Sequence, residues 1–219
     1  MKPEFITISI DGGAGTGKST TAHSLSEALN LLHVDTGSHY RAVTKALLDL
    51  GVSSAEASEY LNKNALPLRT EVDDRRSRLV INQNKYDQTE LRSPEINEYV
   101  SDFSSLSCIR NLLFDYQRSQ VHFAKDNNLA GVVMEGRDIG TVILPDADLK
   151  IFLEADSGIR ANRRIQDGES DQITNRDEKD TTRKIAPLVP ANGCIHVDTG
   201  ILGIEEVTNS ILDVIETLT

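Results

Sequence analysis

A glycine-rich octapeptide, Gly12 to Ser19 (GGAGTGKS), comes one residue after an apolar, β-branched run from Phe5 to Ile10. The run predicts a buried strand, and apolar residues at helical spacing predict a helix from Thr20 to Leu29. The octapeptide therefore matches the pattern G-x-x-x-x-G-K-[ST] in the strand, loop and helix setting that a phosphate-binding loop requires. This unit constrains the fold strongly, because ligands of parallel sheets gather at the carboxyl ends of the strands.

The octapeptide has the chemistry of a polyphosphate site. Glycines let the backbone curl so that several N–H groups point inward, and the next helix adds its positive end. The residues expected to hold ATP are Gly12, Gly13, Ala14, Gly15, Thr16, Gly17, Lys18, Ser19 and Thr20. Lys18 is expected to reach the β- and γ-phosphates, and the Ser19 hydroxyl to complete the shell of a Mg²⁺ ion. A glycine-rich turn without a ligand is the alternative.

Composition excludes several other classes. Acidic residues outnumber basic ones by 34 to 23, for a net charge of -11, which argues against nucleic-acid binding through a general basic face. No apolar run suits a signal peptide or membrane span, so a cytoplasmic protein is expected. Cys108 and Cys194 belong to no CxxC pair and are expected to be buried, reduced thiols. The five histidines form no metal-ligand pattern.

Strand and helix patterns alternate along the rest of the chain, which predicts an α/β fold with a mainly parallel sheet covered on both faces. The further strands are expected at Leu31 to Val34, Val132 to Met134, Leu149 to Leu153 and Gly193 to Val197. The further helices are expected from Tyr40 to Leu50, from Pro94 to Asn127, from an N-cap at Ser157, and from Ile204 to Leu218.

Two segments interrupt this alternation. Residues from about Leu66 to Arg92 are polar, with short strands suggested at Leu79 to Ile81 and at Tyr86, and a hairpin turn at Gln83-Asn84. This segment is interpreted as an insertion. Asp167 to Lys184 has almost no apolar residues and is expected to be a mobile surface segment.

Arginines are concentrated at predicted strand ends and in the second polar segment. They are Arg41, Arg110, Arg137, Arg160, Arg163, Arg164, Arg176 and Arg183. In an acidic chain such a set suggests a binding site for a second phosphate group, since one guanidinium group can donate two parallel hydrogen bonds to phosphate oxygens. Arg160 and Arg164 are four residues apart, share a helix face and are expected to clamp the nucleotide. Each arginine taken alone is also compatible with a solvated surface position.

Several stretches beyond the loop resemble bacterial cytidylate kinases. They are Val34 to Gly37 with Tyr40-Arg41, Glu135 to Val142 (EGRDIGTV), Lys150 to Leu153, Arg176 to Asp180, and Ala186 to Pro190 (APLVP). The resemblance runs almost end to end and implies a three-layer P-loop fold with a small monophosphate-binding insertion and a short lid. The implied parts are a core at about 1–60, 94–165 and 186–219, an insertion at about 61–93, and a lid at about 166–185.

The resemblance implies transfer of the γ-phosphoryl group of MgATP to CMP or dCMP, in a monomer. It places cytosine near Thr36, Ser101, Arg110 and Asp138, and the CMP phosphate near Arg41 and Arg137. It places the ribose near Arg176 and Asp180, with Arg183 reaching toward the transferring group. Lys18, Arg137, Arg176 and Arg183 would neutralise charge during transfer, and no general base is named.

The chain departs from the family pattern between Arg164 and Arg176, where only eleven residues stand in place of a longer helical stretch in many relatives. A short lid with altered closure is therefore expected. Two alternatives stay open: a P-loop kinase with another acceptor, such as UMP, and a nucleotide-binding regulator without turnover. The regulator is disfavoured because the set of arginines suits a second phosphate group.

The pentapeptide HVDTG occurs twice, at His33 to Gly37 and at His196 to Gly200. The flanking sequences differ, so a duplication is not indicated. Both copies are expected to be strand ends at the same edge of the sheet, where Asp and Thr can satisfy backbone donors. The first copy is assigned to substrate binding, and Asp198-Thr199 of the second to a structural role.

Overall fold

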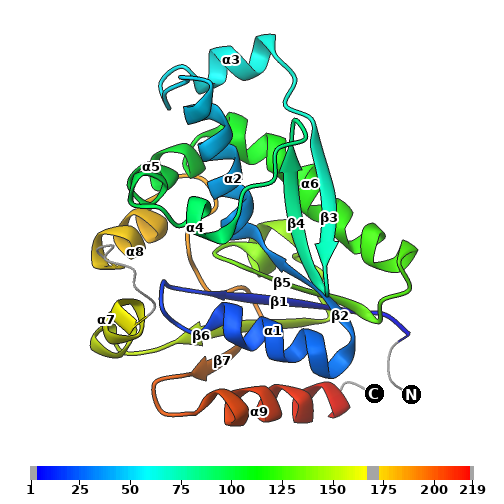
Figure 1. Cartoon of the computed structure of the whole chain (residues 1–219). Helices are drawn as coiled ribbons and strands as arrows, with labels where there is room; N and C mark the ends of the chain where they lie inside the picture. Colours follow the sequence, from blue (N-terminus) through cyan, green and yellow to red (C-terminus); the bar gives the residue numbers. More distant parts are fainter. Residues whose placement is uncertain (1–3, 167–172, 218–219) are drawn as a thin grey trace.

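The computed structural model describes residues 4–166 and 173–217, with only the backbone for residues 173–176. In this part of the chain one sheet has the strand order β3-β4-β2-β5-β1-β6-β7, and its β3–β4 pair is antiparallel (Figure 1). The strands are β1 (Ile6–Gly12), β2 (Leu31–Asp35), β3 (Leu68–Asp73), β4 (Arg76–Ile81), β5 (Gly131–Gly136), β6 (Leu149–Glu154) and β7 (Ile195–Asp198). The expected α/β fold with a mainly parallel sheet is confirmed.

Helices cover both faces of this sheet and complete three layers (Figure 1). They are α1 (Lys18–Leu29), α2 (Thr36–Asp49), α3 (Ala57–Lys63), α4 (Gln88–Leu91), α5 (Pro94–Ser104), α6 (Ser107–Asp126), α7 (Ser157–Gln166), α8 (Ile173–Thr182) and α9 (Ile204–Thr217), with a π-helical turn, η1 (Ile139–Ile143). One apolar cluster joins α1 and α9 to β1 and β6, and another joins α6 and η1 to β2 and β5. Every residue of β2 and β5 is buried, as expected for central strands covered twice.

The loop between β1 and α1 needs its glycines for two physical reasons. A Cβ on Gly12 would lie 2.4 Å from the carbonyl oxygen of Leu153, so the backbones approach too closely for a side chain. Gly17 has φ 84°, a left-handed conformation that costs glycine little, and α1 begins at the next residue, Lys18. The loop is therefore held at the carboxyl edge of the sheet by its own backbone geometry.

The predicted turn at Gln83-Asn84 lies one residue too late, because the tight turn is at residues 82 and 83, and it does not join two full strands. The hairpin joins β3 to β4 and turns at Asp74-Arg75, while residues 82 and 83 have positive φ and make a separate tight turn after β4. The sequence of β3 (LRTEVD) shows no apolar run because it is an edge strand whose six residues are all partly or fully exposed. The second predicted strand, at Tyr86, is wrong, since residues 85–87 are neither strand nor helix. The tyrosine packs instead beside the apolar cluster around α2.

Other predicted elements change in detail. The helical pattern expected from Pro94 to Asn127 is confirmed and comprises two helices, α5 and α6, which are separated at residues 105–106. The N-cap of α7 is Asp156 rather than Ser157, because Oδ1 of Asp156 accepts a hydrogen bond from the Gly158 amide at 2.8 Å. Both cysteines are free thiols, but they are half-buried rather than buried.

The polar segment expected to be mobile contains a helix, α8, at residues 173–182. Ion pairs connect α8 to the core. In an ordinary amphipathic helix, apolar packing would make this connection instead. Residues 167–172 of the same predicted segment lie outside the described residues. Among the described helices, none combines the length and the apolar composition that a membrane span needs.

Candidate functional site

A cavity of about 220 Å³, here called the central cavity, lies at the carboxyl ends of β1, β2 and β5. Predicted site residues that line it are Ala14, Gly15, Gly17, Lys18, Ser19, Thr20, Thr36, Arg41, Ser101, Arg137, Asp138, Arg164, Asp180 and Arg183. Predicted residues with described side chains outside this lining are Gly12, Gly13, Thr16, Arg110 and Arg160. The side chain of Arg176 lies outside the described residues. Segments far apart in the sequence thus converge on one site, as the motifs predicted.

The P-loop, residues 12–19, forms one wall of the cavity. The Lys18 ammonium donates to the carbonyl oxygen of Gly13 at 2.6 Å, and the Thr16 hydroxyl donates to the same oxygen at 3.0 Å. Lys18 is buried, so its positive charge is confined to the site. The arrangement combines the glycine-rich backbone, the start of α1 and one cation, which together can bind a polyphosphate.

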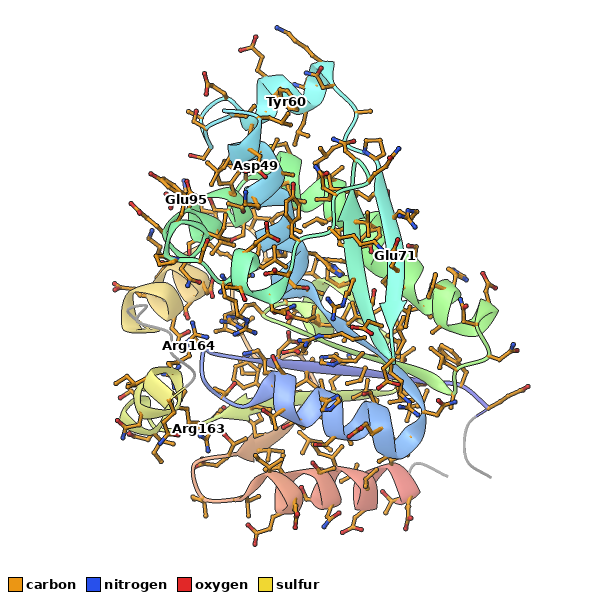
Figure 2. All side chains as sticks on the ribbon, viewed as in Figure 1. Asp49, Tyr60, Glu71, Glu95, Arg163 and Arg164 are labelled. Atoms are coloured by element: carbon orange, nitrogen blue, oxygen red, sulfur yellow. The ribbon has the colours of Figure 1, made fainter. Side chains whose placement is uncertain are left out.

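Helices α7 and α8 bring charged side chains to the P-loop. Arg160 donates to the carbonyl oxygen of Ala14 at 3.0 Å and pairs with Asp177. Oδ1 of Asp177 accepts a hydrogen bond from the Ala14 amide at 3.0 Å. Figure 2 shows Arg163 and Arg164 leaving α7 in different directions, and only Arg164 lines the central cavity. The expected arginine pair, Arg160 and Arg164, therefore flanks the P-loop from one helix.

The Asp177 contact leads to a prediction about α8. Asp177→Asn should accelerate amide hydrogen exchange in α8 about fivefold or more, because the neutral amide loses the ion pair with Arg160, a loss of about 1–2 kcal/mol. Exchange followed by mass spectrometry measures this. Glu178→Gln is the matched control, because Glu178 is the next residue of the same helix and is exposed. Equal exchange rates in the two variants would contradict the role of Asp177.

Ser19 is placed to serve as a metal ligand. Its hydroxyl donates to Oε2 of Glu135, at the end of β5, at 2.9 Å, which leaves the lone pairs of the hydroxyl for a cation. The described residues contain no group of three or more His, Cys, Asp or Glu side chains that could bind a metal without other ligands. Mg²⁺ often keeps water and phosphate ligands in addition to a few protein oxygens, so this sparse site fits it.

Two ion-pair groups that share Arg183 lie at and beside the cavity wall. Asp138 pairs with Arg110, and its Oδ1 also accepts from Arg183 at 3.2 Å. Asp180 of α8 accepts from Nε of Arg137 at 2.9 Å and lies 3.6 Å from Arg183. Burial lowers the pKa of Arg183, while the neighbouring carboxylate of Asp138 opposes this shift. Three arginines and two carboxylates are thus held in a region with little access to water.

Arg41 and Thr36 are positioned by the first HVDTG segment and α2. Asp35 caps α2 by accepting from the Ser38 amide at 3.1 Å, which fixes the start of the helix after β2. The Thr36 hydroxyl donates to the carbonyl oxygen of Glu135 at 2.8 Å. Arg41 is buried and donates to the carbonyl oxygen of Leu91 and to Oδ1 of Asn97. Its guanidinium group is therefore fixed at the cavity wall.

Several residues of the cavity wall are absent from the predicted site, among them Tyr40, Arg92 and Glu135. The guanidinium of Arg110 lies over the Tyr40 ring at 5.4 Å, and burial raises the pKa of Tyr40 to about 12. Tyr40 lies in the helix that follows the first HVDTG segment, and Glu135 lies at a strand end in the EGRDIGTV stretch. The sequence therefore did contain a signal for both residues. No sequence pattern indicates Arg92, because it reaches the cavity from a loop after α4.

The second HVDTG segment contacts the P-loop and stabilises its backbone. The buried hydroxyl of Thr199 lies 3.0 Å from the carbonyl oxygen of Thr16, to which it donates, and Arg163 donates to Thr199 at its hydroxyl and its carbonyl oxygen. Oδ1 of Asp198 accepts from the Gly200 amide at 2.8 Å. These contacts agree with the structural role predicted for this copy.

Thr199→Val should lower the free energy of unfolding by about 1 kcal/mol and weaken ATP binding by severalfold, because the P-loop loses a buried hydrogen bond at Thr16. Urea unfolding and calorimetric titration with an ATP analogue measure the two effects. Thr217→Val is the control, because its hydroxyl is exposed and bonds only within α9. An equal loss in both variants would contradict a specific role for Thr199.

Comparisons with known proteins agree with the geometry. The model of the family described as Cytidylate kinase matches residues 8–217. The chain is 38% identical to a cytidylate kinase of Thermotoga neapolitana, over 95% of this chain and 96% of that protein. It is 39% identical to a cytidylate kinase of Caldicellulosiruptor bescii, over 95% and 94% of the two chains.

A solved structure also matches the fold. A candidate kinase from Chloroflexus aurantiacus superposes with a TM-score of 0.52 at 13% identity, over 99% of this chain and 98% of that one. At this identity the match supports the fold alone.

Proposed function

The chain belongs to the cytidylate kinase family, and we propose that it transfers the γ-phosphoryl group of MgATP to CMP or dCMP, giving CDP or dCDP and ADP. The observation that carries the proposal is the central cavity, which is lined both by the P-loop and by arginines from other segments, Arg41, Arg137 and Arg183. A P-loop alone binds one polyphosphate. A second set of cations across a shared cavity provides for an acceptor that carries its own phosphate.

Phosphoryl transfer depends mainly on position and on stabilising charge, so the protein needs no nucleophile of its own. Lys18 binds the phosphates of ATP on the P-loop side. Arg137 and Arg183, with Arg176, bind the phosphate of the acceptor and the group in transit, and Arg41 anchors the acceptor phosphate. Asp180 accepts a hydrogen bond from Nε of Arg137 at 2.9 Å, which keeps the guanidinium group of Arg137 directed at the site.

Mg²⁺ would be held by Ser19 together with phosphate oxygens and water, and when bound it would neutralise phosphate charge. Arg160 and Arg164 flank ATP on the P-loop side of the cavity. The remaining P-loop residues, Gly12 to Thr16, supply backbone amides. Burial of the wall limits water, which would otherwise compete with the acceptor for the phosphoryl group.

Base recognition follows from Asp138 and its partners. Cytosine presents an amino donor at N4 where uracil presents a carbonyl acceptor, and a carboxylate only accepts hydrogen bonds. Asp138, fixed by Arg110 and Arg183, is therefore suited to cytosine and unsuited to uracil. Ser101 and Thr36 also line the cavity and add hydroxyl groups to it.

The domain assignment is part of the proposal. The core comprises about 1–60, 94–165 and 186–219, the monophosphate-binding insertion about 61–93, and the short lid about 166–185. The enzyme is proposed to be a cytoplasmic monomer that acts on small nucleotides, without nucleic-acid or membrane partners. The net charge of -11 supports the exclusion of a general nucleic-acid surface.

The test is an ADP-release assay with MgATP and each of CMP, dCMP, UMP, AMP, TMP and GMP. Turnover concentrated on CMP and dCMP is expected. Asp138→Asn should lower the preference for CMP over UMP about tenfold or more, since the amide can donate to uracil O4. Asp126→Asn, at the exposed end of α6, is the matched control. Even turnover of all six acceptors, or ATP binding without turnover, would contradict the proposal.

A further inference from the structure

His33 is a buried histidine of β2 that has no role in the site described above. It is 2% exposed, and its Nε2 lies 2.8 Å from Oε1 of Glu135 on the neighbouring strand β5. Glu135 is equally buried, and its other oxygen, Oε2, accepts the hydrogen bond of Ser19 at 2.9 Å. The three side chains form one hydrogen-bonded series, from the interior of the sheet to the hydroxyl of the P-loop.

The chemistry of the three groups sets the direction of each hydrogen bond. A carboxylate only accepts, so His33 donates from Nε2 and Ser19 donates its hydroxyl proton. Because a hydroxyl has one proton, its lone pairs then point away from Glu135. Oxygen lone pairs are the ligands that Mg²⁺ takes, so the orientation of Glu135 determines how Ser19 meets the cation.

Glu135 cannot hold that orientation without help. The terminal torsion of a glutamate side chain is soft, and a buried carboxylate with too few donors is unfavourable. His33 supplies a donor from a neighbouring strand at the oxygen that Ser19 does not use. His33 does not line the central cavity, so any effect on the site passes through Glu135.

We propose that His33 is a positioning residue for metal binding: it fixes the Glu135 carboxylate, which in turn directs the lone pairs of Ser19 toward Mg²⁺. The inference rests on the proposed assignment of Ser19 to the metal. It does not depend on which nucleotide accepts the phosphoryl group. Removing a group that orients a metal ligand typically weakens metal binding tenfold or more.

The experiment measures Mn²⁺ binding by electron paramagnetic resonance, with the β,γ-imido analogue of ATP present and no acceptor. His33→Leu removes the donor and should weaken Mn²⁺ binding about tenfold relative to the unmodified protein. His33→Gln keeps an N–H donor near the position of Nε2 and should restore binding to within about threefold. The rescue separates a positioning role from a merely structural one.

His23→Leu is the matched control. Its ring lies 6.5 Å from that of His33, but the side chain is exposed on α1 and pairs with Glu27 rather than with Glu135. This variant should bind Mn²⁺ as the unmodified protein does. If His33→Leu does not fold, His33→Asn takes its place, because the shorter amide remains polar and does not reach Glu135.

Two outcomes would overturn the inference. The first is unchanged Mn²⁺ binding in a folded His33→Leu or His33→Asn variant. The second is a loss in His33→Gln as large as that in His33→Leu, with urea unfolding of both variants like that of the unmodified protein. Failure of the unmodified protein to phosphorylate CMP would overturn the proposed function instead, because the Mn²⁺ measurement contains no acceptor.

Discussion

Arg137→Ala is expected to lower the turnover of CMP by a factor on the order of 10² to 10³. Arg137 lines the central cavity from the loop after β5, and Nε donates to Asp180, so the guanidinium is directed before any substrate binds. Phosphoryl transfer develops charge on the phosphate oxygens, and a fixed cation in a site with little water stabilises that charge strongly. Steady-state ADP release with CMP varied measures kcat and KM separately.

Two further variants make this prediction specific. Arg137→Lys keeps the charge but lacks the planar fork, so it should fall between Arg137→Ala and the unmodified protein. Arg69→Ala is the control, because Arg69 lies on the exposed edge strand β3 and pairs with Glu71. Turnover by Arg137→Ala within about threefold of the control would remove Arg137 from the proposed catalytic set.

Asp11→Ala is expected to lower the free energy of unfolding by roughly 2–5 kcal/mol near neutral pH. Asp11 is the buried, penultimate residue of β1, where Oδ1 accepts from the Ile139 amide and Oδ2 from the Gly140 amide, both at 2.8 Å. Alanine leaves both buried amides without this acceptor. The affected turn follows directly on Arg137 and Asp138, so turnover should fall as well. Urea unfolding and the ADP-release assay measure the two losses.

The contribution of Asp11 depends on pH in a direction that the burial determines. Burial raises the pKa of Asp11 from 3.8 to about 6, against the opposing effect of its two backbone hydrogen bonds. Between these values the folded protein binds more protons than the unfolded chain, so the stability from this group increases as pH falls through about 6 toward 4. It is lost as pH rises through the same window.

The stability difference between the unmodified protein and Asp11→Ala should therefore widen on acidification. From about pH 7.5 to about pH 5, roughly one pKa unit of the window is crossed, which corresponds to about 1.4 kcal/mol. Comparing the two proteins at each pH removes the contribution of groups that both share. Asp148→Ala, an exposed aspartate that bonds to Thr7, is the control for an aspartate-to-alanine change. A difference that narrows on acidification would contradict the raised pKa.

Much of the site follows from local patterns. The P-loop, the first HVDTG segment and the EGRD segment are each short and follow predicted strands, and parallel strands bring their carboxyl ends to one edge. The structure gathers Lys18, Arg41 and Arg137 around one cavity accordingly. Asp180 and Arg183 line the same cavity, and the resemblance of the 176–180 and APLVP stretches to the family had predicted both for the site.

The local sequence patterns could not predict polar contacts between distant segments. Asp177 meets the P-loop amide of Ala14 across 163 positions, and Thr199 meets Thr16 across 183. A hydrogen bond between two loops leaves no periodic signal in either segment, since each residue alone is compatible with a solvated surface. The same reason hid the series from His33 through Glu135 to Ser19.

The sequence by itself determined the class of the fold, the position of the phosphate-binding loop and the family, because hydrophobic periodicity and glycine geometry act over a few residues. Only the tertiary structure decided the path of the β3–β4 hairpin, the order in α8 and the partners of Asp11 and His33. Edge strands and helices held by ion pairs bury too little apolar surface to show a pattern. Buried polar groups are decided by which donors and acceptors meet once the layers have packed.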